Sequence, residues 1–141
     1  MIYLDSNIVV ALCAREQDSD KVETALAQIQ GSLLTSEWTR VEFTSAIGIK
    51  VRNRELSEPL ARRALADYYE AFEPGIRVVT PTREDYILAA DSLQDIKSGL
   101  RSGDALHLAV AINHKATRLL TLDKVFIKAA SGINLPVELP W

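Results

Sequence analysis

The residues best suited to chemistry are four acidic side chains that lie far apart along the chain: Asp5, Glu42, Asp104 and Asp123. Each is placed where a predicted helix meets a strand of a predicted parallel sheet, and the carboxyl ends of such strands meet at one edge. Four carboxylates within ~5 Å of one another would repel by about 3 kcal/mol per pair. A divalent cation relieves this repulsion, and ligands that are all oxygen favour Mg²⁺ or Mn²⁺ over Zn²⁺. The pattern predicts a metal site suited to phosphodiester hydrolysis.

The four acids are expected to divide the work. Asp5 is the first choice for a ligand that bridges two cations, with Asp104 and Asp123 as further ligands, and Glu42 either binds metal or orients the attacking water. Short polar side chains that could hold these carboxylates and waters in place are those of Ser6, Asn7 and Thr121.

Each acid also has a purely structural explanation. Asp104 and Asp123 suit the first turn of a helix, where carboxylates are favoured. Asp5 could be a turn residue, and Glu42 could lie on a solvated helix face. However, Asp5 and Asp104 adjoin apolar segments that must be buried, so it is the combination of four acids that indicates a site.

The elements that position these acids alternate between strands and helices. Strands are predicted at residues 2–5, 33–35, 76–80, 119–122 and 137–139 from short apolar, β-branched runs. Helices are predicted at residues 8–14, 18–30, 36–53, 57–72, 82–96 and 123–130, with a further one capped by Ser102. This alternation predicts an α/β fold with a parallel sheet covered on both faces, formed as one domain over residues 1–141. The helices at 36–53 and 57–72 are expected to protrude as a hairpin.

Composition narrows the class of protein. The 141 residues are 48% hydrophobic and 25% charged, without an apolar run long enough for a membrane span. The apolar start lacks the features of a signal peptide, and the single Cys13 fits a reducing compartment, so we expect a cytoplasmic protein. Cys13 itself is expected to be a small buried hydrophobe.

The net charge of −3 hides a basic stretch that could bind a phosphate backbone. The alternative is that these side chains only form solvated helix faces. The candidate RNA contacts are Arg40, Lys50, Arg52 and Arg54, and Arg62 and Arg63 follow in the same stretch.

Two further residues have more than one interpretation. His107 lies three positions after Asp104 and so projects from the same side of a helix, which makes a metal or catalytic role conceivable. A lone histidine in an apolar helix is more often a hydrogen-bonded structural residue, and we expect that role here. Trp38, one helical turn before Glu42, could stack a base or pack in the core.

Four short motifs in order give a more specific resemblance. They are residues 3–7 (YLDSN), Glu42 in a helix after Thr35 and Ser36, residues 103–109 (GDALHLA) and residues 121–126 (TLDKVF). Over nearly the whole chain this set resembles the PIN-domain family, and within it the VapC toxins of toxin–antitoxin pairs. Many relatives carry a further Asp or Asn shortly after the acid of the fourth motif, whereas Lys124, Val125 and Phe126 follow Asp123 here.

The resemblance implies a three-layer α/β/α sandwich and a Mg²⁺- or Mn²⁺-dependent ribonuclease. It also implies a homodimer and inhibition by a small VapB-like antitoxin, which often places a basic side chain near the acidic site. Trp38 is a candidate to receive an antitoxin side chain, as an alternative to its other roles. The family's acidic site carries over to Asp5, Glu42, Asp104 and Asp123, and its supporting hydroxyl to Thr121.

Other classes of protein fit less well or remain open. A haloacid-dehalogenase-type phosphatase would need a second Asp where Asn7 stands. A response-regulator receiver would need an Asp after the third strand, where Thr80 and Pro81 follow. Two alternatives keep the fold: a PIN-like module that binds RNA or protein without cutting, and a housekeeping RNA-processing nuclease.

Overall fold

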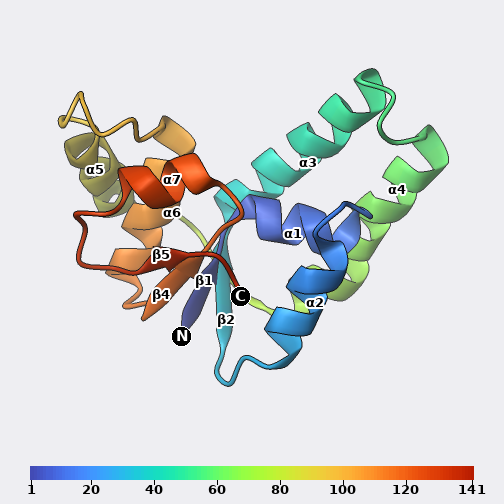
Figure 1. The fold of residues 1–141 in the computed structure, drawn as a ribbon, viewed down its shortest axis with the longest axis horizontal. Coiled ribbons are helices and arrows are strands. Elements are labelled where there is room, and N and C mark those ends of the chain that lie inside the picture. Colours follow the sequence, from blue (N-terminus) through green and yellow to red (C-terminus); the bar gives the residue numbers. More distant parts are fainter.

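The computed structural model describes residues 1–141 and contains one sheet of five parallel strands in the order β3-β2-β1-β4-β5 (Figure 1). The strands are β1 (Ile2–Leu4), β2 (Leu33–Ser36), β3 (Arg77–Val79), β4 (Arg118–Leu120) and β5 (Val137–Glu138). The helices are α1 (Ser6–Cys13), α2 (Ser19–Ala27), α3 (Glu37–Arg52), α4 (Glu58–Asp67), α5 (Arg83–Ser92), α6 (Ser102–Asn113) and α7 (Lys124–Ala129). A π-helical turn (Tyr68–Phe72) and a 3₁₀ turn (Glu73–Gly75) continue α4. The predicted α/β/α sandwich is confirmed.

Alternation along the central strand β1 creates the two cores. Ile2 and Leu4 point to one face, where they join Ile8 of α1 and Val22 of α2 in one buried cluster. Tyr3 points to the opposite face, into the buried cluster formed with α5, α6 and α7. Because side chains alternate with a period of two, Tyr3 is directed toward α6, and this direction matters for the site below.

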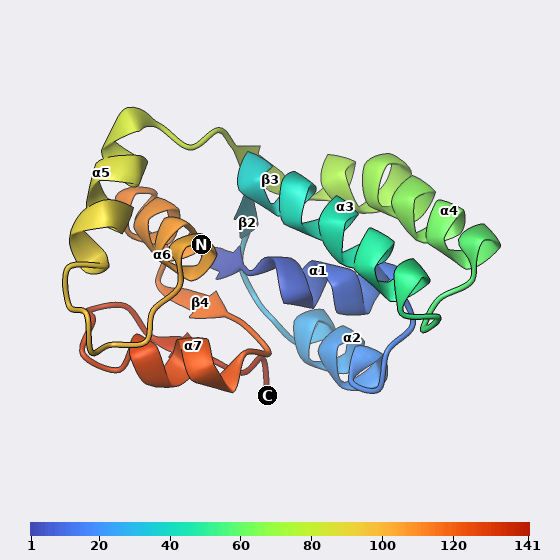
Figure 2. The same ribbon diagram turned by 90° about the horizontal axis from the view of Figure 1, so that it is seen from above.

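Helices α3 and α4 extend away from the sheet as the predicted hairpin (Figures 1 and 2). Their base is fixed by a third apolar cluster with α1, in which the rings of Phe43 and Tyr68 stack with centroids 4.6 Å apart. Aromatic pairs of this kind contribute beyond the area that they bury. The hairpin is therefore anchored beside the sheet, and Glu42 lies on its first helix, α3.

Several helix ends differ from the sequence prediction; for example, α1 begins at Ser6 rather than residue 8, and α2 ends at Ala27 rather than near residue 30. The capping box of Thr82 and Asp85 opens α5 as expected, but the helix ends at Ser92 rather than near residue 96. Its last turn tightens into bonds three residues apart, such as Gln94 N to Asp91 O at 3.1 Å, and a tightened turn of this kind closes a helix. Arg101, not Ser102, is the N-cap of α6, and no side chain caps that helix.

The sheet order places the site at a topological switch point. From β1 the chain passes to β2 and β3 on one side, and then to β4 and β5 on the other. Asp5 follows β1, and its backbone N–H donates to Leu120 O at the end of β4 (3.0 Å). The carboxyl ends of β1 and β4 therefore form the crevice where ligands bind in open α/β sheets.

No helix in the structure has the length and apolarity needed to cross a bilayer.

Candidate functional site

Asp5 is the centre of the acidic site. It is 4% exposed, and its backbone is extended (φ −69°, ψ 156°), so that it acts as the N-cap of α1. One carboxylate oxygen, Oδ1, accepts from the backbone N–H of Ser6 (2.6 Å), and the other, Oδ2, accepts from Asn7 Nδ2 (2.7 Å) and Thr121 Oγ1 (2.6 Å). Anchoring by three hydrogen bonds fixes the carboxylate in one orientation.

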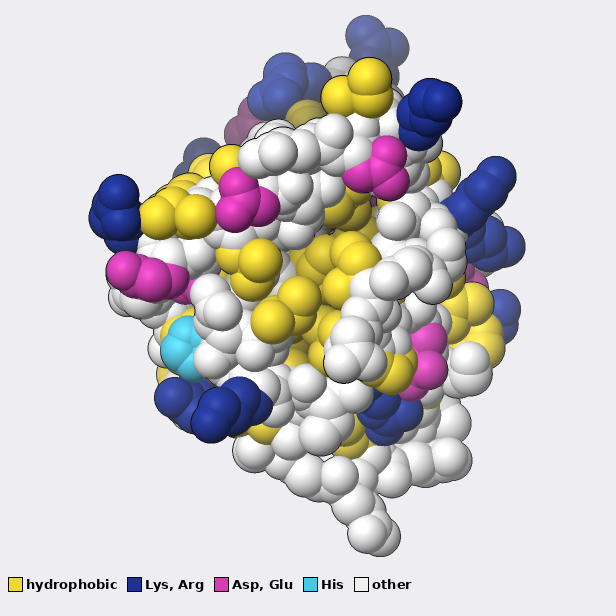
Figure 3. Space-filling view, turned by 90° about the vertical axis from the view of Figure 1, so that its left-hand side faces the viewer, with side chains coloured by type: hydrophobic (Ala, Val, Ile, Leu, Met, Phe, Trp, Pro, Cys, Tyr) yellow, Lys and Arg dark blue, Asp and Glu magenta, His cyan; other side chains and the backbone are white.

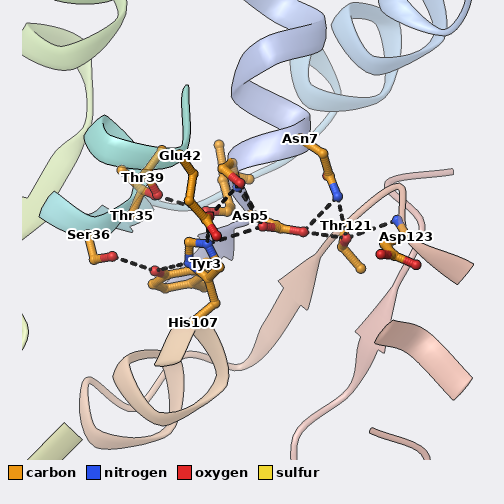
Figure 4. A network of polar contacts seen from close by, with 12 residues as sticks. Tyr3, Asp5, Asn7, Thr35, Ser36, Thr39, Glu42, His107, Thr121 and Asp123 are labelled. Carbon is orange, nitrogen blue, oxygen red and sulfur yellow. Dashed lines mark hydrogen bonds and ion pairs between the residues drawn. The ribbon is translucent and has the colours of Figure 1, made fainter. Parts of the chain in front are cut away.

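Asn7 and Thr121 join the ends of β1 and β4 around that carboxylate (Figure 4). Asn7 Nδ2 also donates to Thr121 Oγ1 (2.9 Å), while Asn7 Oδ1 accepts from the backbone N–H of Leu122 (2.9 Å). Thr121 Oγ1 in turn accepts from the backbone N–H of Asp123 (3.0 Å). The three residues expected to support the acids, Ser6, Asn7 and Thr121, thus all touch Asp5.

Glu42 reaches the same place from α3. Its Oε2 accepts from Ser6 Oγ (2.8 Å) and lies 2.6 Å from His107 Nε2. Burial would raise the pKa of Glu42, but the hydrogen bonds and charge of His107 and the hydrogen bond of Ser6 lower it below its ordinary value. Glu42 is therefore held as a carboxylate beside Asp5.

The sequence did not establish a role in the site for His107, and the structure places this residue among the acids. It is 1% exposed on α6, and its Nε2 lies 2.6 Å from Glu42 Oε2 and 3.3 Å from Asp5 Oδ1. Burial would lower the pKa of His107, but Tyr3, Asp5 and Glu42 raise it well above its ordinary value. The expected hydrogen-bonded role is seen: one ring nitrogen bonds to Tyr3 and the other to Glu42, which is itself one of the acids. The signal available in the sequence was the three-residue spacing from Asp104.

Asp104 contributes an unpaired oxygen. Its Oδ2 is buried without any hydrogen-bond partner. Burial raises the pKa of Asp104 to about 6, and the charges of Asp5 and Asp123 add to this effect. A buried carboxylate oxygen that lacks a partner and feels two like charges is what a cation would satisfy. The donor set is all oxygen apart from His107, which fits Mg²⁺ or Mn²⁺.

The carboxylate of Asp123 is only partly available to bind a cation, because both of its oxygens already have partners. Its Oδ1 caps α7 by accepting from the backbone N–H groups of Val125 (2.7 Å) and Phe126 (3.2 Å). Its Oδ2 lies 3.4 Å from Arg101 Nη1. The helix-capping alternative for Asp123 is thus realised in the structure.

The four predicted acids are not equally close. Asp5, Glu42 and His107 each offer one ligand atom, and these atoms all lie within 4.8 Å of one another. Asp104 and Asp123 lie outside this tight group. They are still close to it, because the charges of Asp5 and Asp123 both raise the pKa of Asp104. The structure therefore gathers the acids at one edge with Asp5 and Glu42 at the centre.

The candidate RNA contacts separate into paired and unpaired cations. Arg40 is bound to Glu73 (2.5 Å) and Glu37, and Lys50 is bound to Glu16 and Glu55. Arg52 and Arg54 are exposed and make no ion pair. A shallow hollow along α3 runs between Arg40 and Arg52, whereas a larger one between α2 and Trp141 is remote from the acids.

Trp38 is partly buried against the α5–α7 core, and its indole N–H is buried without a hydrogen-bond partner.

Cys13 is half-buried, and burial, with the charge of Asp67, raises the pKa of its thiol to about 12. The thiol is therefore protonated at neutral pH and unsuited to act as a nucleophile.

The sheet order and the acidic edge define a class of α/β protein. The sequence profile described as the PIN domain matches residues 2–132, and the chain belongs to the PIN domain family. No curated protein sequence matches the chain significantly.

Solved structures from toxin–antitoxin systems share the fold. The toxin VapC20 of Mycobacterium tuberculosis, described as cleaving the sarcin–ricin loop, is 19% identical, with 94% of this chain and 95% of that chain covered and a TM-score of 0.72. The FitAcB structure from Neisseria gonorrhoeae is 18% identical, with 100% and 99% covered and a TM-score of 0.76. VapBC2 from Rickettsia felis, bound to promoter DNA, is 18% identical, with 100% and 99% covered and a TM-score of 0.68.

Proposed function

We propose that this chain is a Mg²⁺- or Mn²⁺-dependent endoribonuclease. The observation that carries the proposal is the buried, unpartnered Oδ2 of Asp104, which faces the like charges of Asp5 and Asp123 at the switch point of the sheet. Membership of the PIN domain family and the toxin structures that share its fold support the same activity.

In this proposal Asp5, Asp104, Asp123 and Glu42 hold the ion. When bound, the ion would polarise the phosphodiester and lower the pKa of water. Ser6, Asn7 and Thr121 keep the Asp5 carboxylate oriented, and Glu42, held by Ser6 and His107, is placed to orient the attacking water. The unpaired Arg52 and Arg54 on the hairpin are proposed to contact the RNA backbone, with Arg40 and Lys50 contributing less because acids neutralise them.

We further propose that the nuclease is the toxin of a VapBC-type pair. One similar structure, from Klebsiella pneumoniae, is described as a toxin–antitoxin complex. Another, from Rickettsia felis, carries the paired name VapBC2. A cognate VapB-like antitoxin is therefore the proposed inhibitor. We keep the expectation of a cytoplasmic location, because toxin and RNA substrate must meet there.

A homodimer is proposed on the face formed by α5, α6 and α7. Hydrophobic side chains gather in the middle of this face, with charged side chains of both signs around it (Figure 3). On α5 and just beyond it, Tyr86 is 56%, Ile87 44% and Ile96 90% exposed. Light scattering of the purified chain tests this proposal, since a monomer at all concentrations would contradict it.

The activity is tested by incubating purified protein, freed of antitoxin, with total cellular RNA in EDTA, Mg²⁺ or Mn²⁺. Wild type should give discrete cuts only with metal, and Asp104→Asn should give none, because it removes ligand charge at almost constant volume. RNA binding without cleavage under any metal would instead indicate a PIN-like binding module. Cuts confined to precursor RNAs would indicate a processing nuclease.

A further inference from the structure

Behind the acids, a line of buried polar groups connects three elements of the fold to α3. The Tyr3 hydroxyl on β1 donates to Ser36 Oγ at the end of β2 (2.9 Å) and lies 2.8 Å from His107 Nδ1 on α6. The other ring nitrogen of His107 faces Glu42 on α3 and Asp5. Figure 4 shows this line running from Ser36 through Tyr3 and His107 to the carboxylates.

The line leaves the imidazole of His107 little freedom. Tyr3 and Ser36 are 0% exposed and His107 is 1% exposed, so water does not compete for these bonds. The rings of Tyr3 and His107 meet edge-on, with centroids 5.6 Å apart and planes at 63°. Rotation of the imidazole would break the bond at Nδ1 and bury its nitrogen unpaired, which costs more than the bond itself contributes.

A fixed imidazole in turn fixes the distance between two carboxylates. His107 Nε2 lies 2.6 Å from Glu42 Oε2 and 3.3 Å from Asp5 Oδ1, so one nitrogen holds both acids. Ser6 Oγ makes a second connection, at 2.8 Å to Glu42 Oε2 and 3.3 Å to Asp5 Oδ1. His107 does not contact the other two carboxylate oxygens: Asp5 Oδ2 is held by Asn7 and Thr121, and Glu42 Oε1 lies beside Gly103.

We propose that Tyr3 and His107 are positioning residues that set the spacing of Asp5 and Glu42, so that the two carboxylates together bind a divalent cation. The inference rests on the proposed function. His107 positions and does not ligate, because its Nε2 is already in direct contact with Glu42 and because Mg²⁺ and Mn²⁺ prefer oxygen.

The test uses Tyr3→Phe, which removes one buried hydroxyl and keeps the ring. Tyr68→Phe is the matched control, because Tyr68 is equally buried, lies in the third apolar cluster between α1, α3 and α4, and has a hydroxyl without a hydrogen-bond partner. Free Mn²⁺ is measured by electron paramagnetic resonance during titration of each folded protein. Tyr3→Phe should weaken Mn²⁺ binding roughly tenfold, as loss of a partner behind a ligand commonly does. Tyr68→Phe should bind Mn²⁺ as wild type does.

A second pair of variants tests His107 directly. Gln at position 107 can place an N–H donor near the site of Nε2, whereas Ala cannot, so His107→Gln should recover much of the affinity that His107→Ala loses. The chain has only two histidines, so nitrogen NMR of the His114→Gln variant reports His107 alone. Adding Mg²⁺ should leave the Nε2 signal characteristic of a hydrogen-bonded, unligated nitrogen.

The outcomes separate this inference from the proposed function. If wild type binds no Mn²⁺, the proposed metal site is wrong and the inference falls with it. If wild type binds Mn²⁺ and Tyr3→Phe binds it equally well, the metal site stands and the positioning role is overturned. A metal-induced Nε2 shift typical of direct ligation would likewise overturn positioning in favour of ligation.

Discussion

Gly103 on α6 approaches Glu42 on α3 so closely that a Cβ atom at position 103 would stand 2.5 Å from Glu42 Oε1. Real Cβ contacts essentially never fall below 3.0 Å, so one of the two groups would have to move. The absence of a side chain at Gly103 thus creates the space in which the Glu42 carboxylate meets His107 and Ser6. This relationship gives the residue before Asp104 a specific function.

Gly103→Ala should reduce RNA cleavage by roughly tenfold or more, because the new methyl group displaces the Glu42 carboxylate. The thermal midpoint should change little, because the helix propensity gained with Ala, up to about 1 kcal/mol, offsets the contacts that Glu42 loses. The control is Gly132→Ala, where an added Cβ meets nothing within 4 Å. Equal cleavage rates for the two variants would contradict the steric explanation.

Asp104→Asn should stabilise the metal-free protein at neutral pH. The folded-state pKa of Asp104 is raised to about 6 from 3.8, so the folded protein binds its proton more tightly than the unfolded chain. Wild-type stability therefore falls as pH rises from about 4 to about 6, and the penalty persists above pH 6.

Urea unfolding in EDTA measures this effect. The advantage of Asp104→Asn over wild type should be large at pH 7.5 and small at pH 4, where the wild-type carboxyl is protonated. Mg²⁺ should then stabilise wild type more than the variant. Asp91→Asn, on the exposed side of α5, should show neither behaviour. A pH-independent difference would show that burial and like charges do not govern Asp104.

Thr121→Val should lower cleavage by roughly 10–100-fold with a small change in stability. The substitution removes the hydroxyl that donates to Asp5 Oδ2 (2.6 Å) and accepts from the backbone N–H of Asp123 (3.0 Å). Thr117→Val is the comparison, because Thr117 Oγ1 bonds only to Met1 O at the opposite end of β4. Loss of activity in both variants would point to a general effect on the strand.

The double variant Arg52→Ala/Arg54→Ala should weaken RNA binding and flatten its dependence on salt. Both arginines are exposed and unpaired on the protruding hairpin, so their charge is available to phosphates. Arg63→Ala should weaken RNA binding less, because the guanidinium of Arg63 is already paired with Asp67 at 2.8 Å. The measurement is the affinity of metal-free protein for RNA at several salt concentrations, for wild type and for each variant. An unchanged salt slope would place the RNA path elsewhere.

The fold could be predicted largely because the local signals agreed with one another. The capping box at Thr82 and Asp85 and the alternation around Tyr3 specify their elements without tertiary information. The end of α5 was missed because residues 93–96 keep a helix-compatible composition, and the tight last turn depends on packing.

The candidate site was predictable in position but not in detail. Strand ends and helix starts placed Asp5, Asp104 and Asp123 at one edge of the sheet, since parallel strands share that edge. The orientation of each side chain depends on contacts between distant segments. That His107 would face Asp5 and Glu42 depends on how α6 packs on β1, which no local pattern encodes.

The most direct test of the proposed metal site is the Asp5→Asn variant, compared with wild type in cleavage of total cellular RNA with Mg²⁺. Asp5 is the one acid held by Ser6, Asn7 and Thr121 together, so this variant changes the ligand charge at almost constant volume. We predict a folded protein whose cleavage rate falls by more than about a hundredfold, beyond the loss expected for a supporting residue. A folded Asp5→Asn protein that cuts RNA at the wild-type rate would contradict a metal site centred on Asp5.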